Sequence, residues 1–173
     1  MNLPNKLTLL RIALILPFLL VLYLDAPCAP YIALAIFIAA SLTDMLDGKI
    51  ARKRGLVTDF GKFADPLADK MLVTAAMLWF VEIGRMPGWA LLIVVVREFA
   101  VSGLRMVASD KGRVIAAGWS GKVKTASTMA CIVLMFLPIP AAANTACVGV
   151  IVVTTIYSGV EYFLKNKDCL SDM

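Results

Sequence analysis

The stretch "TDMLDGKIARKRGLVTDFGKFADPLADK", from Thr43 to Lys70, holds five aspartates and a dense run of lysines and arginines. Apolar stretches lie directly before and after it, at roughly 30–50 and 64–83. The length of each stretch is close to the length of about 20 residues that a helix needs to cross a bilayer. The charged stretch therefore predicts the junction of two membrane-spanning helices, on one side of the membrane.

The rest of the chain continues this apolar pattern. Of its 173 residues 61% are hydrophobic, with a mean hydropathy of +0.86, whereas a soluble domain is about 45–50% apolar. Apolar stretches of near-spanning length lie at roughly 7–24, 30–50, 64–83, 87–108, 124–140 and 145–164. We therefore expect an all-α integral membrane protein, with six transmembrane helices in one bundle and a single domain over residues 1–173.

Positive charge is unevenly distributed around these stretches, and the chain carries a net charge of +5. Lysines and arginines gather at the start, in the second and fourth loops and after the sixth stretch, whereas the alternate loops hold only Arg85. By the positive-inside rule both termini lie in the cytoplasm, and so does the charged junction. We expect a multi-pass protein of the cell membrane, with the aspartates of this junction on the cytoplasmic side.

The N-terminus has some features of a signal peptide, because Lys6 precedes an apolar stretch. Arg11 interrupts that stretch, however, and no clear small-x-small cleavage site precedes a polar mature chain. We expect an uncleaved first spanning helix.

The aspartates of the charged junction fall on helical faces. One helical face at the end of the second apolar stretch carries Asp44, Asp47, Gly48 and Ala51, which stand at positions i, i+3, i+4 and i+7. One face at the start of the third stretch carries Gly61, Asp65 and Asp69, which stand at positions i, i+4 and i+8. Between them "KRGLVTDF", residues 53–60, predicts a tight turn that leaves Asp59 in solvent. Two antiparallel helices joined by this turn would bring the other four carboxylates together.

Four converging carboxylates call for a cation. An aspartate at the centre of a spanning helix costs about 2.5–3.5 kcal/mol, and neighbouring carboxylates repel one another. Oxygen ligands without histidine or thiolate favour Mg²⁺ or Mn²⁺ over zinc, and two such ions about 3.5–4 Å apart are a recognised arrangement for phosphoryl transfer. Gly48, Ala51 and Gly61 leave space for a ligand, and Arg52 is a possible phosphate partner.

From Asp44 to Asp69 the chain reads D-x2-D-G-x2-A-R-x8-G-x3-D-x3-D. This pattern resembles the signature of the CDP-alcohol phosphotransferase family, and the six-span layout and the length fit that family too. The resemblance implies that Asp44, Asp47 and Asp65 hold two divalent ions, and that Asp69 lies near the second ion and acts as the general base. It also implies a CDP-lipid site made of Asn5, Thr8, Asp47, Gly48, Ala51, Arg52 and Gly61.

A second group of polar residues lies in the fourth apolar stretch. The segment "REFAVSGLR" places Arg97, Val101 and Arg105 on one helical face. Arg97 follows "ALLIVVV" in an apolar helix, where an arginine normally faces a polar cavity or a partner. Glu98 points about 100° away from it around the helix and is not expected to be its direct partner.

The fifth stretch begins with "SGKVKT", which carries Lys122 and Lys124, with Ser120 as a possible N-cap. An anionic ligand could satisfy Arg97, Arg105 and these lysines together. An alternative stays open, in which Arg105 and the two lysines are ordinary positive-inside charges.

Together with "NLPNKLTLLR" at residues 2–11, these segments resemble the members of the family whose acceptor is sn-glycerol 3-phosphate. The resemblance implies transfer of a phosphatidyl group from CDP-diacylglycerol to that alcohol, with release of CMP, by a homodimer in the lipid bilayer that binds no nucleic acid. The acceptor's phosphate would be held by Arg11, Arg97, Arg105, Lys122 and Lys124.

Three other functions are compatible with parts of the sequence. Another member of the same family could use inositol phosphate, which also carries a phosphate. An intramembrane prenyltransferase also binds a diphosphate through aspartates and Mg²⁺, although the D-G-x2-A-R and G-x3-D-x3-D segments argue against it. A transporter could line a solute path with membrane carboxylates and arginines.

Overall fold

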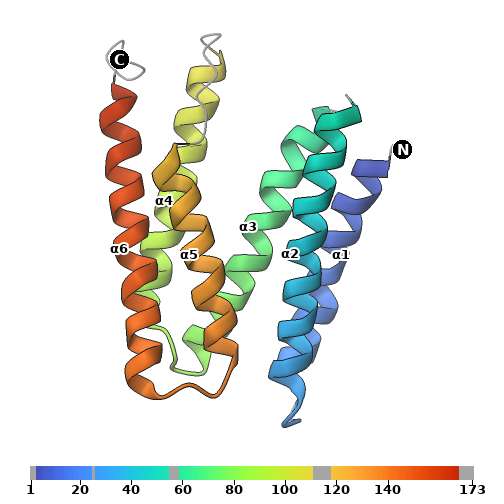
Figure 1. The fold of residues 1–173 in the computed structure, drawn as a ribbon, viewed down its shortest axis with the longest axis vertical. Helices are drawn as coiled ribbons and strands as arrows, with labels where there is room; N and C mark the ends of the chain where they lie inside the picture. Colours follow the sequence, from blue (N-terminus) through green and yellow to red (C-terminus); the bar gives the residue numbers. More distant parts are fainter. Residues whose placement is uncertain (1–2, 25, 55–58, 111–117, 168–173) are drawn as a thin grey trace. The chain divides into compact units, whose positions relative to one another are not determined.

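The computed structural model describes the backbone of residues 3–24, 26–54, 59–110 and 118–167, and the side chains of 9–10, 12–24, 26–43, 70–109 and 118–167. Six α-helices and no β-strand occur in the described backbone (Figure 1). The helices are α1 (Leu3–Leu22), α2 (Ala29–Arg54), α3 (Asp59–Glu82), α4 (Gly88–Asp110), α5 (Trp119–Phe136) and α6 (Ala141–Lys165).

Each predicted apolar stretch falls on one of these helices, but several helix ends differ from the prediction. Both ends of the segment predicted as a turn, residues 53–60, are helical, because α2 continues to Arg54 and α3 begins at Asp59. Residues 55–58 of that segment lie outside the described backbone. Lysine, arginine and alanine are good helix formers, so the helix extends beyond its apolar part. Helix α5 ends at Phe136, before Pro138 and Pro140, which cannot continue a helix.

The chain divides into two compact units, Met1–Trp79 and Phe80–Met173, which are described separately. In the first unit α1 and α2 pack side by side (Figure 1). The rings of Phe18 and Phe37 are buried between these helices, with their centroids 6.4 Å apart. Small side chains at helical spacing on α2 allow close packing, and the buried ones are Ala29, Ala33 and Ala40.

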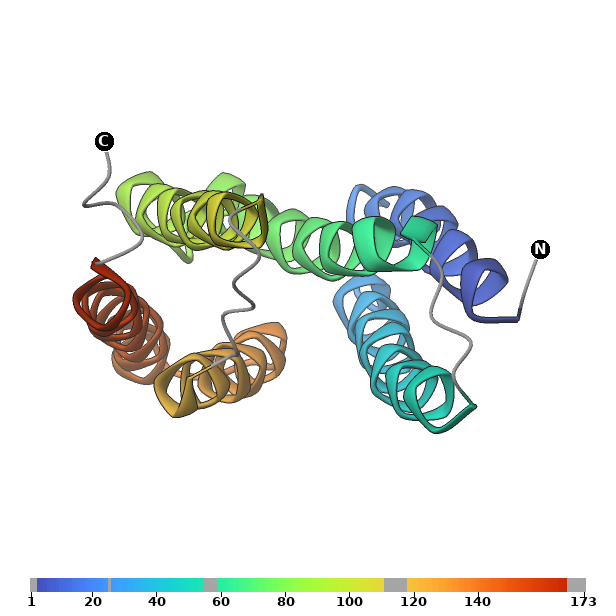
Figure 2. The same cartoon turned by 90° about the horizontal axis from the view of Figure 1, so that it is seen from above.

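In the second unit α4 and α5 each pack against α6 (Figure 2). A buried cluster joins Val101, Leu104 and Ala108 of α4 to Tyr162 of α6. Between α5 and α6 the buried apolar side chains include Ile132, Met135 and Ile151. Helix α6 therefore provides the surface on which the other two helices of this unit are arranged.

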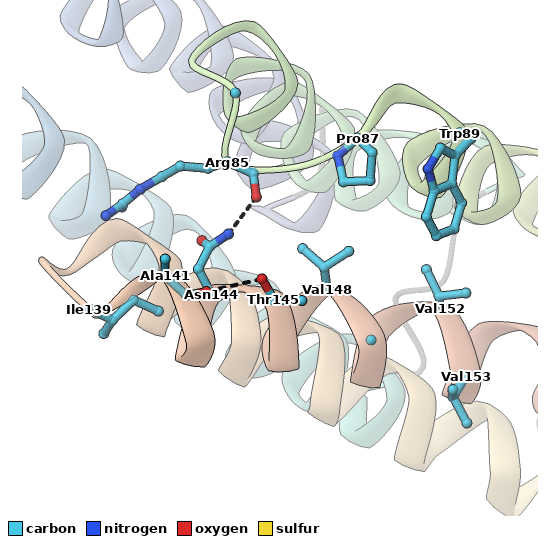
Figure 3. A pocket seen from close by; sticks show the side chains of 12 residues that line it. Arg85, Pro87, Trp89, Ile139, Ala141, Asn144, Thr145, Val148, Val152 and Val153 are labelled. Carbon is cyan, nitrogen blue, oxygen red and sulfur yellow. Dashed lines mark hydrogen bonds between the residues drawn. The ribbon is translucent and has the colours of Figure 1, made fainter.

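Arg85 joins the turn between α3 and α4 to the end of α5. Its Nη1 donates hydrogen bonds to the carbonyl oxygens of Met135, at 2.5 Å, and Leu137, at 3.3 Å. In return the Asn144 side chain of α6 donates to the Arg85 carbonyl at 2.6 Å (Figure 3). The last carbonyls of a helix lack partners within that helix and carry partial negative charge. The guanidinium therefore caps α5, and the turn is held from both sides.

One helix in the described part of the chain, α6, is long and apolar enough to cross a membrane. Two shorter apolar helical segments are Ile12–Leu22 and Ala29–Thr43. The outward face of α6 carries exposed apolar side chains, among them Val153, Val160 and Leu164. The all-helical fold is therefore confirmed, whereas the six spans, the orientation of the termini and the single domain stay predictions.

Candidate active site

The aspartate motif is carried by two helices. Helix α2 contains Asp44, Asp47, Gly48, Ala51 and Arg52, and α3 contains Gly61, Asp65 and Asp69. The helical spacing assumed for the motif therefore applies in both helices. The side chains of these residues lie outside the described set, as do those of Asn5, Thr8 and Arg11 of α1. The convergence of the four carboxylates stays a prediction.

The residues of the predicted metal site also lie outside the described side chains. Among the side chains that the structure describes, no group of three or more histidines, cysteines, aspartates or glutamates is placed to hold a metal ion. All four predicted ligands, Asp44, Asp47, Asp65 and Asp69, lie outside those side chains. Two divalent ions therefore stay a prediction that rests on the residue types and their spacing.

The predicted acceptor-binding residues of the second unit, Arg97, Arg105, Lys122 and Lys124, lie among the described side chains. Arg97 lies within α4 with only 13% of its side chain exposed. Its Nη1 donates to Oε1 of Glu98 at 2.9 Å, and its Nη2 donates to Oγ of Ser158 in α6 at 2.7 Å. The expectation that an arginine in this apolar helix faces a polar partner is confirmed.

Lys124 of α5 joins the same group. Its Nζ lies 2.6 Å from Oε1 of Glu98, and 6% of its side chain is exposed. A buried ammonium requires such a partner, because an isolated charge in an apolar interior costs far more than a paired one. Lys124 is therefore no ordinary surface charge. We call Arg97, Glu98, Lys124 and Ser158 the polar cluster, which links α4, α5 and α6 inside the second unit.

The prediction that Glu98 is a poor partner for Arg97 was wrong. Their Cβ atoms do point about 100° apart around the helix, but both side chains are long enough to bend toward one another. In an apolar bundle two opposite charges lower their free energy by meeting, since there is little water to solvate either one. Lys124 adds to this effect, because it approaches the same carboxylate oxygen from the next helix.

Arg105 lies farther along the face of α4 that carries Arg97. Its Nε donates to the Tyr162 hydroxyl at 3.0 Å, and its guanidinium carbon is 5.6 Å from the centre of that ring. Ser158 and Tyr162 are one turn apart on α6, so both arginines of α4 contact the same helix. The shared face predicted for Arg97 and Arg105 is confirmed.

Lys122 does not join the polar cluster. Its side chain is exposed on α5 and makes no hydrogen bond or ion pair among the described residues. The possible N-cap role of Ser120 was also wrong, because α5 begins at Trp119 and its N-cap is Gly118, which makes no side-chain cap bond. An extended Gly118 already allows the chain to enter the helix, and its carbonyl accepts the N–H of Lys122.

Several buried polar atoms near the polar cluster have no hydrogen-bond partner among the described residues. They are Nε of Arg97, Oγ1 of Thr128 and Oγ1 of Thr155. Thr128 is one turn beyond Lys124 on α5, and Thr155 is one turn before Ser158 on α6. Buried donors are normally satisfied, so the Arg97 guanidinium retains a donor for a ligand or a water molecule.

Sequence reasoning missed Glu98, Ser158 and Tyr162 as members of this region. A serine and a tyrosine in an apolar helix are common and carry little signal by themselves. Glu98 did carry a sequence signal, because it is the only acidic residue between Glu82 and Asp110. Its place in an apolar helix beside an arginine could have indicated a buried ion pair.

A groove of about 690 Å³ lies at the N-terminal ends of α4 and α6 (Figure 3). Its walls are mainly apolar, with Trp89 and Pro87 on one side and Val148, Val152 and Val153 of α6 on the other. The two carbonyl bonds of the Arg85 guanidinium fasten it to the end of α5, and the Asn144 amide is bonded to the Arg85 carbonyl. The groove is therefore a mainly apolar cavity with little free charge, unlike the polar cluster.

These features define a class of protein. The chain is apolar and, in its described backbone, helical, with a carboxylate motif spread over two helices and a half-buried arginine and a buried lysine in the helices that follow. The chain belongs to the CDP-alcohol phosphatidyltransferase family, whose sequence model matches residues 1–157. The family predicted from the aspartate motif is therefore confirmed.

Two bacterial relatives are similar along almost the whole chain. A CDP-diacylglycerol–glycerol-3-phosphate 3-phosphatidyltransferase of Bacillus subtilis is 42% identical over 98% of this chain and 97% of its own length. A protein of the same name from Escherichia coli K12 is 36% identical over 99% of this chain and 98% of its own. The similarity thus covers both the aspartate motif and the polar cluster.

Proposed function

We propose that this protein transfers the phosphatidyl group of CDP-diacylglycerol to sn-glycerol 3-phosphate, giving phosphatidylglycerophosphate and CMP. The observation that carries the proposal is the similarity, over nearly full length, to relatives named for this reaction. The polar cluster supports the choice of acceptor, because two cations and one carboxylate leave it with net positive charge. An acceptor with its own phosphate matches that charge better than a neutral alcohol does.

In this proposal all six helices span the cell membrane, with both termini in the cytoplasm. The positive-inside distribution of lysine and arginine supports this orientation. The aspartate motif then lies at the cytoplasmic edge of the bilayer. A lipid whose tails stay in the membrane and a water-soluble alcohol can meet there. The family resemblance further suggests that the protein works as a homodimer.

Divalent ions fit the donor set of the motif. Its four carboxylates offer only oxygen, which Mg²⁺ and Mn²⁺ prefer, and the chain contains no histidine. Asp44, Asp47, Asp65 and Asp69 would hold two such ions. When bound, the ions would neutralise the negative charge of the diphosphate and of the departing CMP.

The residues of the chain then have separate tasks. Asp69 takes the proton from the 1-hydroxyl of glycerol 3-phosphate. The hydroxyl oxygen bonds to the phosphorus nearest the diacylglycerol, and the bond from that phosphorus to CMP breaks. The CDP head is held by Asn5, Thr8, Asp47, Gly48, Ala51, Arg52 and Gly61. Arg97 and Lys124 hold the acceptor's phosphate, and Arg11, Arg105 and Lys122 add positive charge around it.

An acceptor screen tests this function. The purified protein is given CDP-diacylglycerol and Mg²⁺ or Mn²⁺, with glycerol 3-phosphate, inositol phosphate, glycerol or serine, and CMP release is measured. We expect release with glycerol 3-phosphate and none when the divalent ion is chelated. Release with inositol phosphate alone would replace the proposed acceptor. Turnover of a prenyl diphosphate, or solute movement in liposomes without CMP release, would replace the reaction itself.

A further inference from the structure

Glu98 occupies the centre of the polar cluster although no acceptor role was predicted for it. One of its oxygens, Oε1, accepts from Nη1 of Arg97 at 2.9 Å and from Nζ of Lys124 at 2.6 Å. Since both nitrogens bond to one oxygen, they cannot be farther apart than these two distances combined. A carboxylate on α4 thus keeps a cation of its own helix close to a cation of α5.

The arrangement leaves donors for a further anion. Nε of Arg97 is buried without a hydrogen-bond partner among the described residues, although the same guanidinium donates from Nη1 and Nη2. Lys124 has three N–H groups, of which one is directed at Glu98. A phosphate has several acceptor oxygens and can bond to both cations at once. Two cations that are already close together therefore form a better phosphate site than two separate ones.

Resting on the function proposed above, we propose that Glu98 is a positioning residue for the phosphate of the acceptor alcohol. It does not touch the acceptor. It acts through Arg97 and Lys124, whose mutual repulsion it offsets in the apolar bundle before the acceptor arrives. Without this carboxylate the two cations separate, and the site must be reassembled during each binding event, which weakens binding.

The geometry predicts how two variants behave. Glu98→Gln keeps the size of the side chain and one oxygen acceptor but removes the charge that holds the cations together. Glu98→Asp keeps the charge but is one methylene shorter, so that its carboxylate cannot reach Arg97 and Lys124 in the same way. A positioning role requires both charge and reach, whereas simple charge balance requires only the charge.

Glu161 offers a matched control. It is also a glutamate of the second unit, and its side chain is 23% exposed compared with 22% for Glu98. Its ion-pair partner is Lys165, one turn away on α6, instead of Arg97 or Lys124. Glu161→Gln therefore removes one carboxylate of equal exposure from the same bundle and leaves the polar cluster intact.

The experiment measures kcat and the KM of each substrate by CMP release from purified full-length protein. For Glu98→Gln we expect the KM for glycerol 3-phosphate to rise about 10-fold, with the KM for CDP-diacylglycerol within about twofold of wild type. Glu98→Asp should raise the same KM about threefold or more, and Glu161→Gln should leave it unchanged. An unchanged CDP-diacylglycerol KM also shows that the variant is folded.

Other outcomes overturn the inference. A lower KM for glycerol 3-phosphate in Glu98→Gln would mean that Glu98 competes with the phosphate. Equal changes for both substrates, or the same change in Glu161→Gln, would mean a general effect on the bundle. If Glu98→Gln does not fold, a wild-type KM in Glu98→Asp overturns the inference on its own. A wild-type protein without CMP release from glycerol 3-phosphate would instead overturn the proposed function and this inference with it.

Discussion

Gly159 of α6 lies directly against the side chain of Arg97 in α4. A Cβ atom at Gly159 would be 3.2 Å from Cγ of Arg97, which is closer than ordinary van der Waals contact. The hydrogen bonds of the guanidinium to Glu98 and Ser158 fix the far end of the same side chain. The glycine therefore gives the arginine the space to reach the polar cluster.

Replacing this glycine tests whether the path of Arg97 matters for binding. For Gly159→Ala we expect the KM for glycerol 3-phosphate to rise about 3- to 10-fold, because a small displacement of a positioning group weakens its contacts. Gly149→Ala is the control on the same helix, since a Cβ there meets nothing within 4 Å. CMP-release kinetics of both variants make the comparison. Equal KM values for Gly159→Ala and wild type would show that Arg97 adapts without loss.

Lys124 and Lys122 provide a second comparison on one helix. Lys124 is buried and paired with Glu98, whereas Lys122 is exposed. For Lys124→Met we expect the KM for glycerol 3-phosphate to rise about 10- to 100-fold, as loss of a charge-assisted hydrogen bond predicts. Lys122→Met should change it less than about threefold, because an exposed charge acts only at a distance through water. A larger effect at Lys122 would contradict the structural assignment.

The aspartates of the motif are expected to differ in role. Asp69→Asn should lower kcat at least about 100-fold by removing the general base, and binding of the CDP-lipid should stay detectable. Asp44→Ala should instead weaken the metal-dependent binding itself. Equilibrium binding of CDP-diacylglycerol with and without Mg²⁺, measured beside CMP release, separates the two effects. Near-normal turnover in Asp69→Asn would exclude this residue as the base.

Arg85 should matter for stability and little for kinetics. Arg85→Met removes both guanidinium bonds to the end of α5, and we expect the free energy of unfolding to fall by about 1–3 kcal/mol. Lys165→Met is the control, since it also removes one cation but from a side chain that is 68% exposed. Thermal unfolding of the purified proteins in detergent measures the difference. An unchanged midpoint for Arg85→Met would show that the cap contributes nothing.

The helices were predictable because their signal is local. Apolar runs of near-spanning length give the number and order of the helices directly. Their ends were less predictable, because the lysines and arginines that extend α2 to Arg54 are polar yet good helix formers, and because Asp59 is favoured by its place in the first turn of α3 rather than by its intrinsic propensity. The stretch expected at 124–140 also extended too far, because α5 ends at Phe136, before Pro138, and a proline cannot continue a helix.

The polar cluster was only partly predictable, because it depends on packing between distant helices. Sequence spacing correctly placed Arg97 and Arg105 on one face of α4. It could not show that Ser158 lies opposite Arg97, since that contact depends on how α4 packs against α6. It also misjudged Glu98, because an angle between Cβ directions does not describe where a long side chain ends.

The bonds made by Arg85 imply an order of assembly. The guanidinium of Arg85 bonds to Met135, which lies 50 residues later in the chain, and its carbonyl accepts from Asn144, which lies 59 residues later. Because a chain is synthesised from its N-terminus, the turn between α3 and α4 emerges without the groups that later satisfy it. Until the α5–α6 hairpin has been made, the polar groups of that turn must form hydrogen bonds with water instead. The hydrogen bonds of Arg85 can therefore form only after the α5–α6 hairpin has been made, so the α3–α4 turn reaches its final set of partners late in synthesis.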